Sequence, residues 1–354
     1  MKKILCMLLT TVLMIGLLAG SSVISAEEAD SFADIPEITL TYNSTRNELG
    51  DASQLEWLDG ITEATGGKVT FDKYLSSSLI SSPRDIPEGL ASGIADIGLL
   101  NINNYPGVFP LNNTIFSIPL MGITNGNGLD ILNYMYAKYP ELEQEFTDAG
   151  LKLIGWNMAS SVNIGLKLGH EYSSIEDIKN TKITGNGDIA TEILAAAGAV
   201  PVAVAYPDIY QSLEKNVING LLFHVAPVYD TSFYEHIDNW VIFGEDSGLL
   251  YVPVAVCMGL DTWNNLPDEV KAVFEAAEPE RAVSETATQV KYNASLKEKM
   301  EEKGGWFVTM SEDQVAEWLP FVQPTAERLL SDAEATYPGF AAMYEDLCSY
   351  IAGE

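Results

Sequence analysis

The sequence predicts an α/β protein with two lobes. Segments with the patterns of strands and helices alternate along the first half of the chain, and this alternation favours parallel strands covered by helices. A chain of 354 residues is long enough for two domains and a large buried core. The apolar segment Leu151–Asn157 predicts a strand that crosses into a second lobe, and Val252–Met258 predicts a strand that returns to the first.

The elements of the first predicted lobe follow one another in order. Its expected strands are Ile38–Asn43, Lys68–Tyr74 and Ala95–Leu100, and its expected helices are Leu55–Ala64, Ile86–Ser92, Leu129–Tyr139 and Glu141–Ala149. The first two helices stop at Gly66 and Gly93, because glycine adopts without strain the positive φ that commonly ends a helix.

The segment Ser173–Gly220 predicts a compact α/β unit in the second lobe. Ser174 and Asp177 have the spacing of a capping box, which opens a short helical turn. The elements expected after it are a strand Lys182–Thr184, a helix Ile189–Ala197 ended by Gly198, a buried strand Val200–Val204, a helix from Pro207 and a turn at Asn219 and Gly220. Farther on, Pro267 opens a long helix that Pro279 should interrupt.

The N-terminus predicts export. Two lysines precede the uncharged apolar run Ile4–Leu18, which is too short for a comfortable membrane span, and small residues follow it up to Ala26. This pattern is typical of a secretory signal peptide, residues 1–26, cleaved near Ala26. Ser21 stands where a lipid-anchored protein would carry a cysteine. We therefore expect a mature protein that does not span the membrane.

The charge balance excludes one class of partner. The chain has 50 acidic and 19 basic residues and a net charge of −31, whereas a nucleic-acid-binding surface needs a basic stripe. The acidity fits either adaptation to high salt or ordinary solubility, and both interpretations stay open.

Cysteine and histidine patterns predict no metal site. Cys257 and Cys348 are far apart in sequence and have the surroundings of core residues, so two separate thiols are favoured over a disulfide, which an oxidising compartment would permit. No cluster of cysteine and histidine has metal-ligand spacing, and we expect no cofactor.

Five short segments in fixed order carry a family resemblance. They are Ile175–Lys179, Lys182–Ile183, Gly198–Val202, Asp208–Leu213 and Val217–Gly220. Together they resemble the core of the solute-binding proteins of TRAP transporters, the DctP-like extracytoplasmic receptors of bacteria. The resemblance extends over about Ile38 to Ala335.

The resemblance implies a fold, a location and partners. The fold is a two-lobe periplasmic-binding-protein fold, class II-like, with hinge strands and a long helix that bridges the lobes. The first lobe would comprise residues 27–154 and 247–285, and the second residues 155–246 and 286–354. Such a protein works in the periplasm, closes its lobes on a small solute, and delivers it to the small and large membrane subunits of a TRAP permease.

Three positions depart from the family pattern. The family carries an arginine after its short strand, whose planar fork grips a ligand carboxylate, and this chain has Thr184 there. The family's aspartate before Gly220 is Asn219 here, and its asparagine after Met258 is Gly259. These changes predict a ligand without a dominant carboxylate, such as an alcohol, an amine or an amide.

Which cation would replace the missing family arginine stays open. Arg46, in the loop after the first strand, is the better candidate, and Lys182 or Arg84 are others. A solvated surface arginine is the plainer interpretation of Arg46.

The candidate ligand-binding residues share a place near a strand end or turn and a polar or aromatic side chain. They are Tyr42, Asn43, Arg46, Asn101, Asn103, Trp156, Asn157, Asn163, Thr184, Asn186, Tyr206, Tyr210, Phe223, His224 and Tyr229. Structural roles compete with binding for several of them. Trp156 and Tyr210 fit core packing, and His224 fits a buried histidine with its hydrogen bonds satisfied.

Catalysis is not predicted. None of the three histidines lies in a nucleophile-elbow, zinc-helix or phosphate-loop motif. A solute-binding protein is therefore favoured. The alternatives are a sensor for a receptor kinase with the same fold, marked by a neighbouring receptor gene, and a secreted hydrolase, marked by turnover of an ester, glycoside or amide panel.

Overall fold

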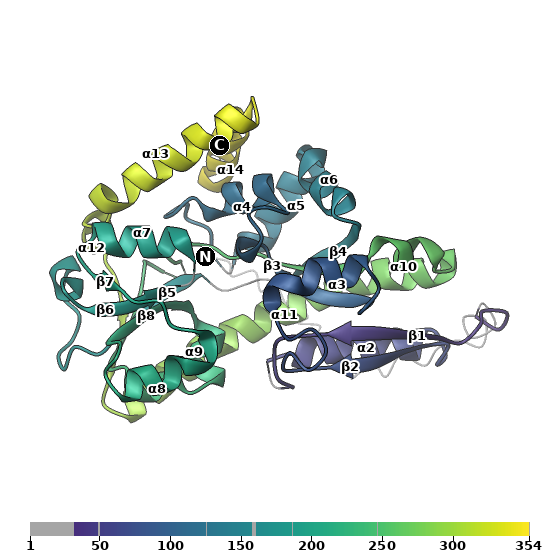
Figure 1. Ribbon diagram of the computed structural model, residues 1–354, viewed down its shortest axis with the longest axis horizontal. Helices are drawn as coiled ribbons and strands as arrows, with labels where there is room; N and C mark the ends of the chain where they lie inside the picture. Colours follow the sequence, from purple (N-terminus) through teal and green to yellow (C-terminus); the bar gives the residue numbers. More distant parts are fainter. Residues whose placement is uncertain are drawn as a thin grey trace, which may run out of the picture.

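Two sheets form the framework of the protein (Figure 1). The computed structural model describes residues 32–48, 50–124, 126–157, 161–185, 187–245 and 247–353. The first sheet has the order β2-β1-β3-β10-β4, with β1 Ile38–Asn43, β2 Val69–Tyr74, β3 Ile97–Asn101, β4 Leu151–Asn157 and β10 Val254–Gly259. The second has the order β11-β9-β5-β8-β6-β7, with β5 Val162–Leu166, β6 Lys182–Gly185, β7 Val200–Pro201, β8 Gly220–His224, β9 Asn239–Ile242 and β11 Trp306–Thr309.

Helices cover both sheets. The first lobe carries α2 Ala52–Ala64, α3 Ile86–Ala91, α4 Pro110–Ser117, α5 Gly128–Lys138, α6 Pro140–Asp148 and α10 Leu260–Asn265. The second carries α7 Asp188–Ala196, α8 Ile209–Glu214, α9 Val225–Asp230 and α12 Glu312–Ala316. The long helix α11, Asp268–Glu302, contacts α2 and β4 in the first lobe and α9 and β11 in the second, and so bridges the two (Figure 1).

Aromatic side chains fill the cores on both faces of the first sheet. Trp57 of α2 packs edge-on against Phe274 of α11, with ring centroids 5.6 Å apart, over one face. On the other face Trp156 of β4 packs edge-on against Phe146 of α6, at 6.0 Å. In the second lobe the buried Trp240 of β9 belongs to a cluster that includes residues of α8, α9 and the C-terminal part of α11. The fold is thus the two-lobe α/β architecture with hinge strands and a bridging helix that the sequence predicts.

The sheets are mixed, whereas the sequence predicted parallel strands. β1 pairs in parallel with β2 and β3, but β10 is antiparallel to β3 and β4. In the second sheet β5 is antiparallel to β8 and β9. The reversed strand of each sheet, β10 in the first and β5 in the second, is a strand that directly follows a strand of the other sheet in the sequence.

Two expected elements differ in the structure. The predicted buried strand Val200–Val204 is only the two-residue edge strand β7, and Val200 is 44% exposed. Pro201 is the last residue of β7, and proline has no backbone N–H to donate to a further strand. Pro279 does not interrupt the long helix, which continues as one element through it. Because α11 is packed on both sides of that position, the loss of one backbone hydrogen bond there is tolerated.

The C-terminal helices lie differently from the expected division into lobes. We expected residues 286–354 to complete the second lobe. Instead α14, Phe340–Ala352, contacts α5 of the first lobe, and α13, Leu319–Thr336, contacts both α7 and α4 (Figure 1). The buried Phe340 and Leu347 belong to the core cluster of the first lobe. Hence the chain returns to the first lobe at its end.

Several local predictions are confirmed. Ser174 and Asp177 form a capping box, in which the Asp177 carboxylate accepts from the backbone N–H of Ser174 at 3.2 Å. Gly198 follows the last residues of α7 and has a φ of 88°, the positive value that commonly ends a helix. Cys257 in β10 and Cys348 in α14 are free thiols.

Candidate ligand-binding site between the lobes

The topology brings the ends of strands from both sheets to one edge. β4 ends at Asn157 and β5 begins at Val162, which pairs with Leu250 of the second passage and with His224 at the end of β8. Val254, the first residue of β10, pairs with both Asn101 and Asn157. The edge where these strand ends meet is called the interlobe edge below. Loops and strand ends of two lobes converge in this way at ligand sites of α/β proteins.

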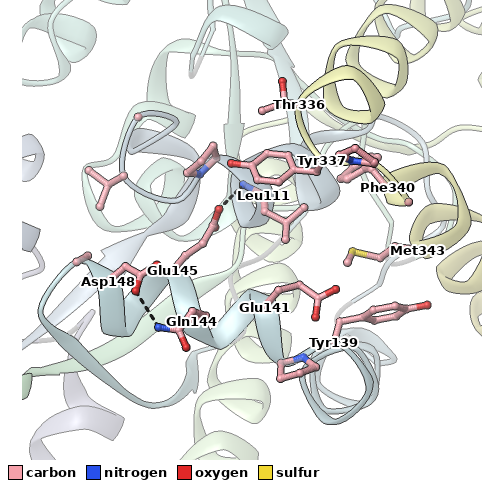
Figure 2. Close-up of a pocket in the computed structure, with 17 residues that line it drawn as sticks. Leu111, Tyr139, Glu141, Gln144, Glu145, Asp148, Thr336, Tyr337, Phe340 and Met343 are labelled. Atoms are coloured by element: carbon pink, nitrogen blue, oxygen red, sulfur yellow. Dashed lines mark hydrogen bonds between the residues drawn. The ribbon is translucent and has the colours of Figure 1, made fainter.

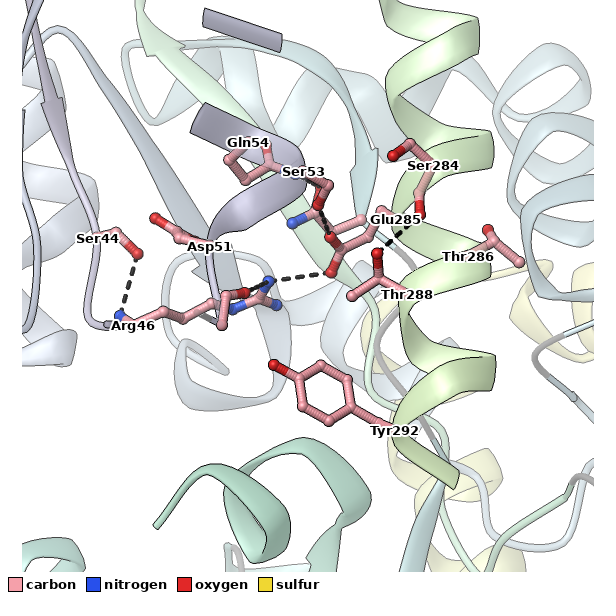
Figure 3. Close-up of polar contacts among 12 residues, drawn as sticks. Ser44, Arg46, Asp51, Ser53, Gln54, Ser284, Glu285, Thr286, Thr288 and Tyr292 are labelled. Atoms are coloured by element: carbon pink, nitrogen blue, oxygen red, sulfur yellow. Dashed lines mark hydrogen bonds and ion pairs between the residues drawn. The ribbon is translucent and has the colours of Figure 1, made fainter. Parts of the chain in front are cut away.

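Arg46 joins the first lobe to the bridging helix at this edge. Its Nη1 donates to Glu285 Oε1 at 3.0 Å and to the carbonyl of Gly50 at 3.3 Å, and the Ser53 hydroxyl donates to the other oxygen of Glu285 (Figure 3). Burial alone would lower the pKa of Arg46, but the carboxylates of Glu285 and Asp51 outweigh it and raise the pKa above its ordinary value. Arg46 is therefore a charged group already paired with the fully buried side chain of Glu285.

Asp51 lies at the start of α2, beside Arg46. Its Oδ2 accepts a hydrogen bond of 2.8 Å from the Tyr42 hydroxyl, and its Oδ1 is buried without a hydrogen-bond partner. Burial raises the pKa of Asp51, although Arg46 and Tyr42 act against this rise. Burial likewise raises the pKa of Tyr42 well above its ordinary value. Tyr42 is thus a core residue that holds a buried carboxyl group.

The second lobe supplies His224, Asp230 and Tyr292. The Tyr292 hydroxyl donates to Asp230 Oδ2 at 3.1 Å. A Cβ atom placed on Gly50 would lie 2.9 Å from the same Asp230 oxygen, so the loop after β1 touches α9 of the second lobe. Burial, and secondarily the charge of Arg46, lowers the pKa of His224 to about 4, so this histidine is neutral at neutral pH. Its Nδ1 has no hydrogen-bond partner.

An ion pair on α11 holds the last residues of β4. Arg281 Nη2 donates to the carbonyl of Trp156 at 2.8 Å, and Glu278 Oε1 accepts from the N–H of Trp156 at 3.2 Å. β4 is an edge strand, so the backbone N–H and carbonyl of Trp156 have no neighbouring strand to bond to on this side. The side chains of Glu278 and Arg281 supply those hydrogen bonds instead. Gly155 makes the approach possible, because a Cβ there would overlap the Glu278 carboxylate. Arg281 Nη1 also donates to Asn157 Oδ1.

The asparagines from the sequence prediction lie at strand ends but have different contacts. Asn43 Oδ1 accepts from the N–H of Ile80 at 3.1 Å, and Asn101 Oδ1 accepts from the N–H of Asn103 at 3.2 Å. Asn163 is bonded at both ends of its amide, to Ser161 O and to the N–H of Phe243. Thr184 on β6 is 2% exposed. Asn186 lies outside the described residues.

The aromatic candidates fall into separate places. Trp156 packs within the first lobe against Tyr136, at 5.1 Å between ring centroids. Tyr206 packs on Phe223 at 6.3 Å and on Phe233 at 5.9 Å. Tyr210 donates to Glu235 at 2.6 Å. Tyr229 packs edge-on against Tyr292 at 5.6 Å, which places it beside the Asp230 contact of the interlobe edge.

Sequence reasoning missed the carboxylates of this edge. Asp51, Asp230 and Glu285 lie around Arg46, and none was singled out. The chain contains 50 acidic residues, so the presence of a carboxylate in a loop or helix distinguishes nothing. Arg281 was missed too, because an arginine inside a long helix has the appearance of a solvated residue. No group of histidine, cysteine or carboxylate side chains in the described part of the chain could hold a metal ion.

A separate hollow lies on the first lobe, away from the strand ends. It has a volume of about 1120 Å³ and is bordered by α4, α6 and the turn between α13 and α14 (Figure 2). Its charged lining residues are all acidic: Glu141, Glu145 and Asp148. The Glu145 carboxylate caps α4, accepting from the N–H groups of Leu111 at 2.7 Å and Asn112 at 3.0 Å.

The fold and the interlobe edge define a two-lobe binding protein. The model of the bacterial extracellular solute-binding proteins of family 7, DctP, matches residues 41–332, and the chain belongs to this family. The family is one of solute receptors rather than of enzymes. Among the described residues, no helix has the length and apolar character of a membrane span.

A relative agrees with this assignment, and solved structures agree with the fold. A solute-binding protein of Chromohalobacter salexigens is 23% identical over 287 residues, which cover 78% of this chain and 80% of the relative. A marine metagenome TRAP solute-binding protein specific for aromatic acids, solved with 3-hydroxybenzoate, superposes with a TM-score of 0.80 at 18% identity over 90% of this chain and 99% of its own. A TRAP solute-binding protein of Rhodoferax ferrireducens, solved with copurified benzoate, gives a TM-score of 0.78 at 17% identity over 89% and 98% of the two chains.

Proposed function

We propose that this chain is the periplasmic solute-binding component of a TRAP-type secondary transporter. It captures a small solute at the interlobe edge by closure of the lobes and delivers it to the small and large membrane subunits of the permease. Family membership and the meeting of strand ends from both sheets support this proposal. Closure would exclude water from the edge and strengthen each polar contact made there.

The solute is a small molecule without a dominant carboxylate. The observation that carries this part is the pairing of Arg46 with Glu285 at 3.0 Å. The sequence adds that Thr184 stands where the family pattern has an arginine. A ligand carboxylate would have to compete with Glu285 for this guanidinium. It would also approach Asp51 and Asp230, and like charges at close range disfavour each other.

The solved structures supply a contrast. The proteins above were solved with 3-hydroxybenzoate and benzoate, and a third, from Chromohalobacter salexigens, with D-glucuronate. All three ligands carry a carboxylate. The polar and aromatic side chains at the interlobe edge here, including Tyr229 and Tyr292, suit an alcohol or an amide instead, through hydrogen bonds and ring contacts.

Native mass spectrometry of the protein purified without refolding tests the solute class. We expect a non-acidic adduct that is released on denaturation and lost in Thr184→Arg. Thr191→Arg is the control, since Thr191 is exposed on α7 and the same charge there should leave the adduct in place. A thermal-shift comparison of 3-hydroxybenzyl alcohol with 3-hydroxybenzoate adds a pair that differs in the carboxylate alone. A bound carboxylic acid would overturn the ligand class and point to Arg46 or Lys182 as the replacement clamp.

A further inference from the structure

We infer that Asn157 presents its amide nitrogen to the solute as a fixed hydrogen-bond donor, with Arg281 and Gln54 as the positioning residues that set its orientation. This inference rests on the proposed function and adds one feature to the solute. The solute must carry an acceptor atom, such as a hydroxyl or carbonyl oxygen, where it meets the end of β4.

Two donors determine which way the Asn157 amide points. Gln54 Nε2 lies 2.9 Å from Asn157 Oδ1, and Arg281 Nη1 donates to the same oxygen. A guanidinium has donors and no acceptor, so the atom facing Arg281 has to be the amide oxygen. The amide nitrogen therefore points away from both partners.

The Arg281 guanidinium is itself held in place. The residue is 2% exposed, and its Nε and Nη2 donate to the two carboxylate oxygens of Glu278 at 2.6 and 2.7 Å. Nη2 also donates to the carbonyl of Trp156, and the guanidinium lies 5.7 Å from the centre of the Trp57 ring. A bidentate pair of this kind fixes the plane of the guanidinium, and through it the amide of Asn157.

The donor is left without a partner. Asn157 is fully buried, and its Nδ2 makes no hydrogen bond. Buried polar groups in proteins are nearly always paired, so an unpaired one calls for an explanation. Ser161 Oγ, on the other side of the first passage between lobes, is also buried and unpaired. Both atoms lie where the chain passes between the lobes, at the interlobe edge, and a solute held there would pair them.

Asn157→Asp separates the donor from the fold. The substitution keeps the shape and leaves an oxygen for Gln54 and Arg281, so the variant should fold with an unchanged or higher Tm. It replaces the unpaired donor by an acceptor, which should weaken solute binding by about tenfold or more. Asn216→Asp is the matched control, since Asn216 Oδ1 also accepts from a cation, Lys167 at 2.7 Å, on the exposed surface.

The binding arm uses a water-soluble metabolite extract of the expression host as its probe, with native mass spectrometry as the readout. Adducts held by the wild type and by Asn216→Asp should be lost from Asn157→Asp. Equal adduct occupancy in all three proteins would overturn the inference. If the wild type holds no adduct from the extract, the result counts against the proposed function rather than against the orientation of Asn157.

A second experiment tests the orientation of the Asn157 amide and needs no ligand. The side-chain amide signal of Asn157, identified in a ¹⁵N spectrum by its loss in Asn157→Asp, should shift in both Arg281→Met and Gln54→Leu. Either variant alone suffices if the other does not fold. An unchanged amide signal would show that the two residues do not position Asn157, and the inference would fall even if the wild type bound an adduct.

Discussion

The carboxylate of Glu285 and the guanidinium of Arg46 lie 3.0 Å apart although the two residues are separated by 239 positions in the sequence. This ion pair attaches the loop after β1 to the bridging helix, at the point where both lobes meet (Figure 3). We expect this ion pair to contribute to stability because the Glu285 side chain has no exposed surface.

Removing Arg46 should destabilise the protein. Arg46→Met leaves the buried Glu285 carboxylate without its cation, which we expect to lower the free energy of unfolding by about 3 kcal/mol. Urea unfolding measures the loss. Arg46→Met with Glu285→Met should recover part of it, since the uncompensated charge is then gone. Arg84→Met, on an exposed arginine, is the control and should change little. Equal changes in the free energy of unfolding for Arg46→Met and Arg84→Met would show that the ion pair does not stabilise the protein.

Gly155 should tolerate no side chain. In Gly155→Ala the new Cβ would overlap the Glu278 carboxylate and displace it from the N–H of Trp156 and from Arg281. We expect a loss of stability of about 3 kcal/mol, within the range seen when a buried polar network is broken. Gly60→Ala is the matched control, because open space surrounds that helical glycine and alanine should stabilise α2 by about 0.5–1 kcal/mol. A neutral Gly155→Ala in thermal unfolding contradicts the role given to Glu278.

His224 should make stability depend on pH. Its pKa is about 4 in the folded protein against an ordinary value of 6.5, so between these values the unfolded chain takes up a proton that the folded protein does not. Stability should therefore fall as the pH drops from 6.5 towards 4. His224→Gln should lose less stability than the wild type between pH 7 and pH 5 in urea titrations.

Two features make this comparison specific to His224. Burial raises the pKa of Asp51 and Asp230, and protonation of these carboxyl groups acts in the opposite direction as the pH falls. The difference between wild type and variant removes their contribution. Thr191→Gln, at an exposed position without a titratable group, should retain the wild-type slope, and identical slopes for all three proteins would count against a buried neutral His224.

The contact between Gly50 and Asp230 should control lobe closure. A Cβ at Gly50 would lie 2.9 Å from Asp230 Oδ2, so Gly50→Ala should push the loop after β1 away from α9. We expect a larger radius of gyration in small-angle X-ray scattering and weaker adduct retention, with little change in Tm. Gly107→Ala, where a Cβ meets open space, serves as control. An unchanged radius of gyration and full adduct retention would remove this contact from the closure mechanism.

The framework of the fold could be predicted from local pattern, and its limits have physical causes. The strand Leu151–Asn157 was predicted residue for residue because its apolar run has clear boundaries. Val200–Val204 was not, since its length depends on a neighbouring strand that the edge of the sheet does not supply. Strand direction in the mixed sheets depends on the passages between lobes, and no local pattern encodes it.

The site was predictable in part for a related reason. Arg46 could be singled out because cations are rare in this chain, and the structure places it at the interlobe edge. Its partner Glu285 could not, because carboxylates are abundant and only tertiary packing distinguishes one from another. The orientation of the Asn157 amide likewise depends on Gln54 and Arg281, which are distant in sequence.

The position of β10 between β3 and β4 has a consequence for synthesis. β3 and β4 are made early, yet the strand that joins them begins at Val254, after all strands of the second sheet except β11. During chain elongation the first lobe therefore keeps two unpaired strand edges until the second lobe is nearly complete, and pairing across such long separations is slow. A ribosome-bound or truncated chain ending before Val254 should remain sensitive to protease in its N-terminal half and require protection from aggregation.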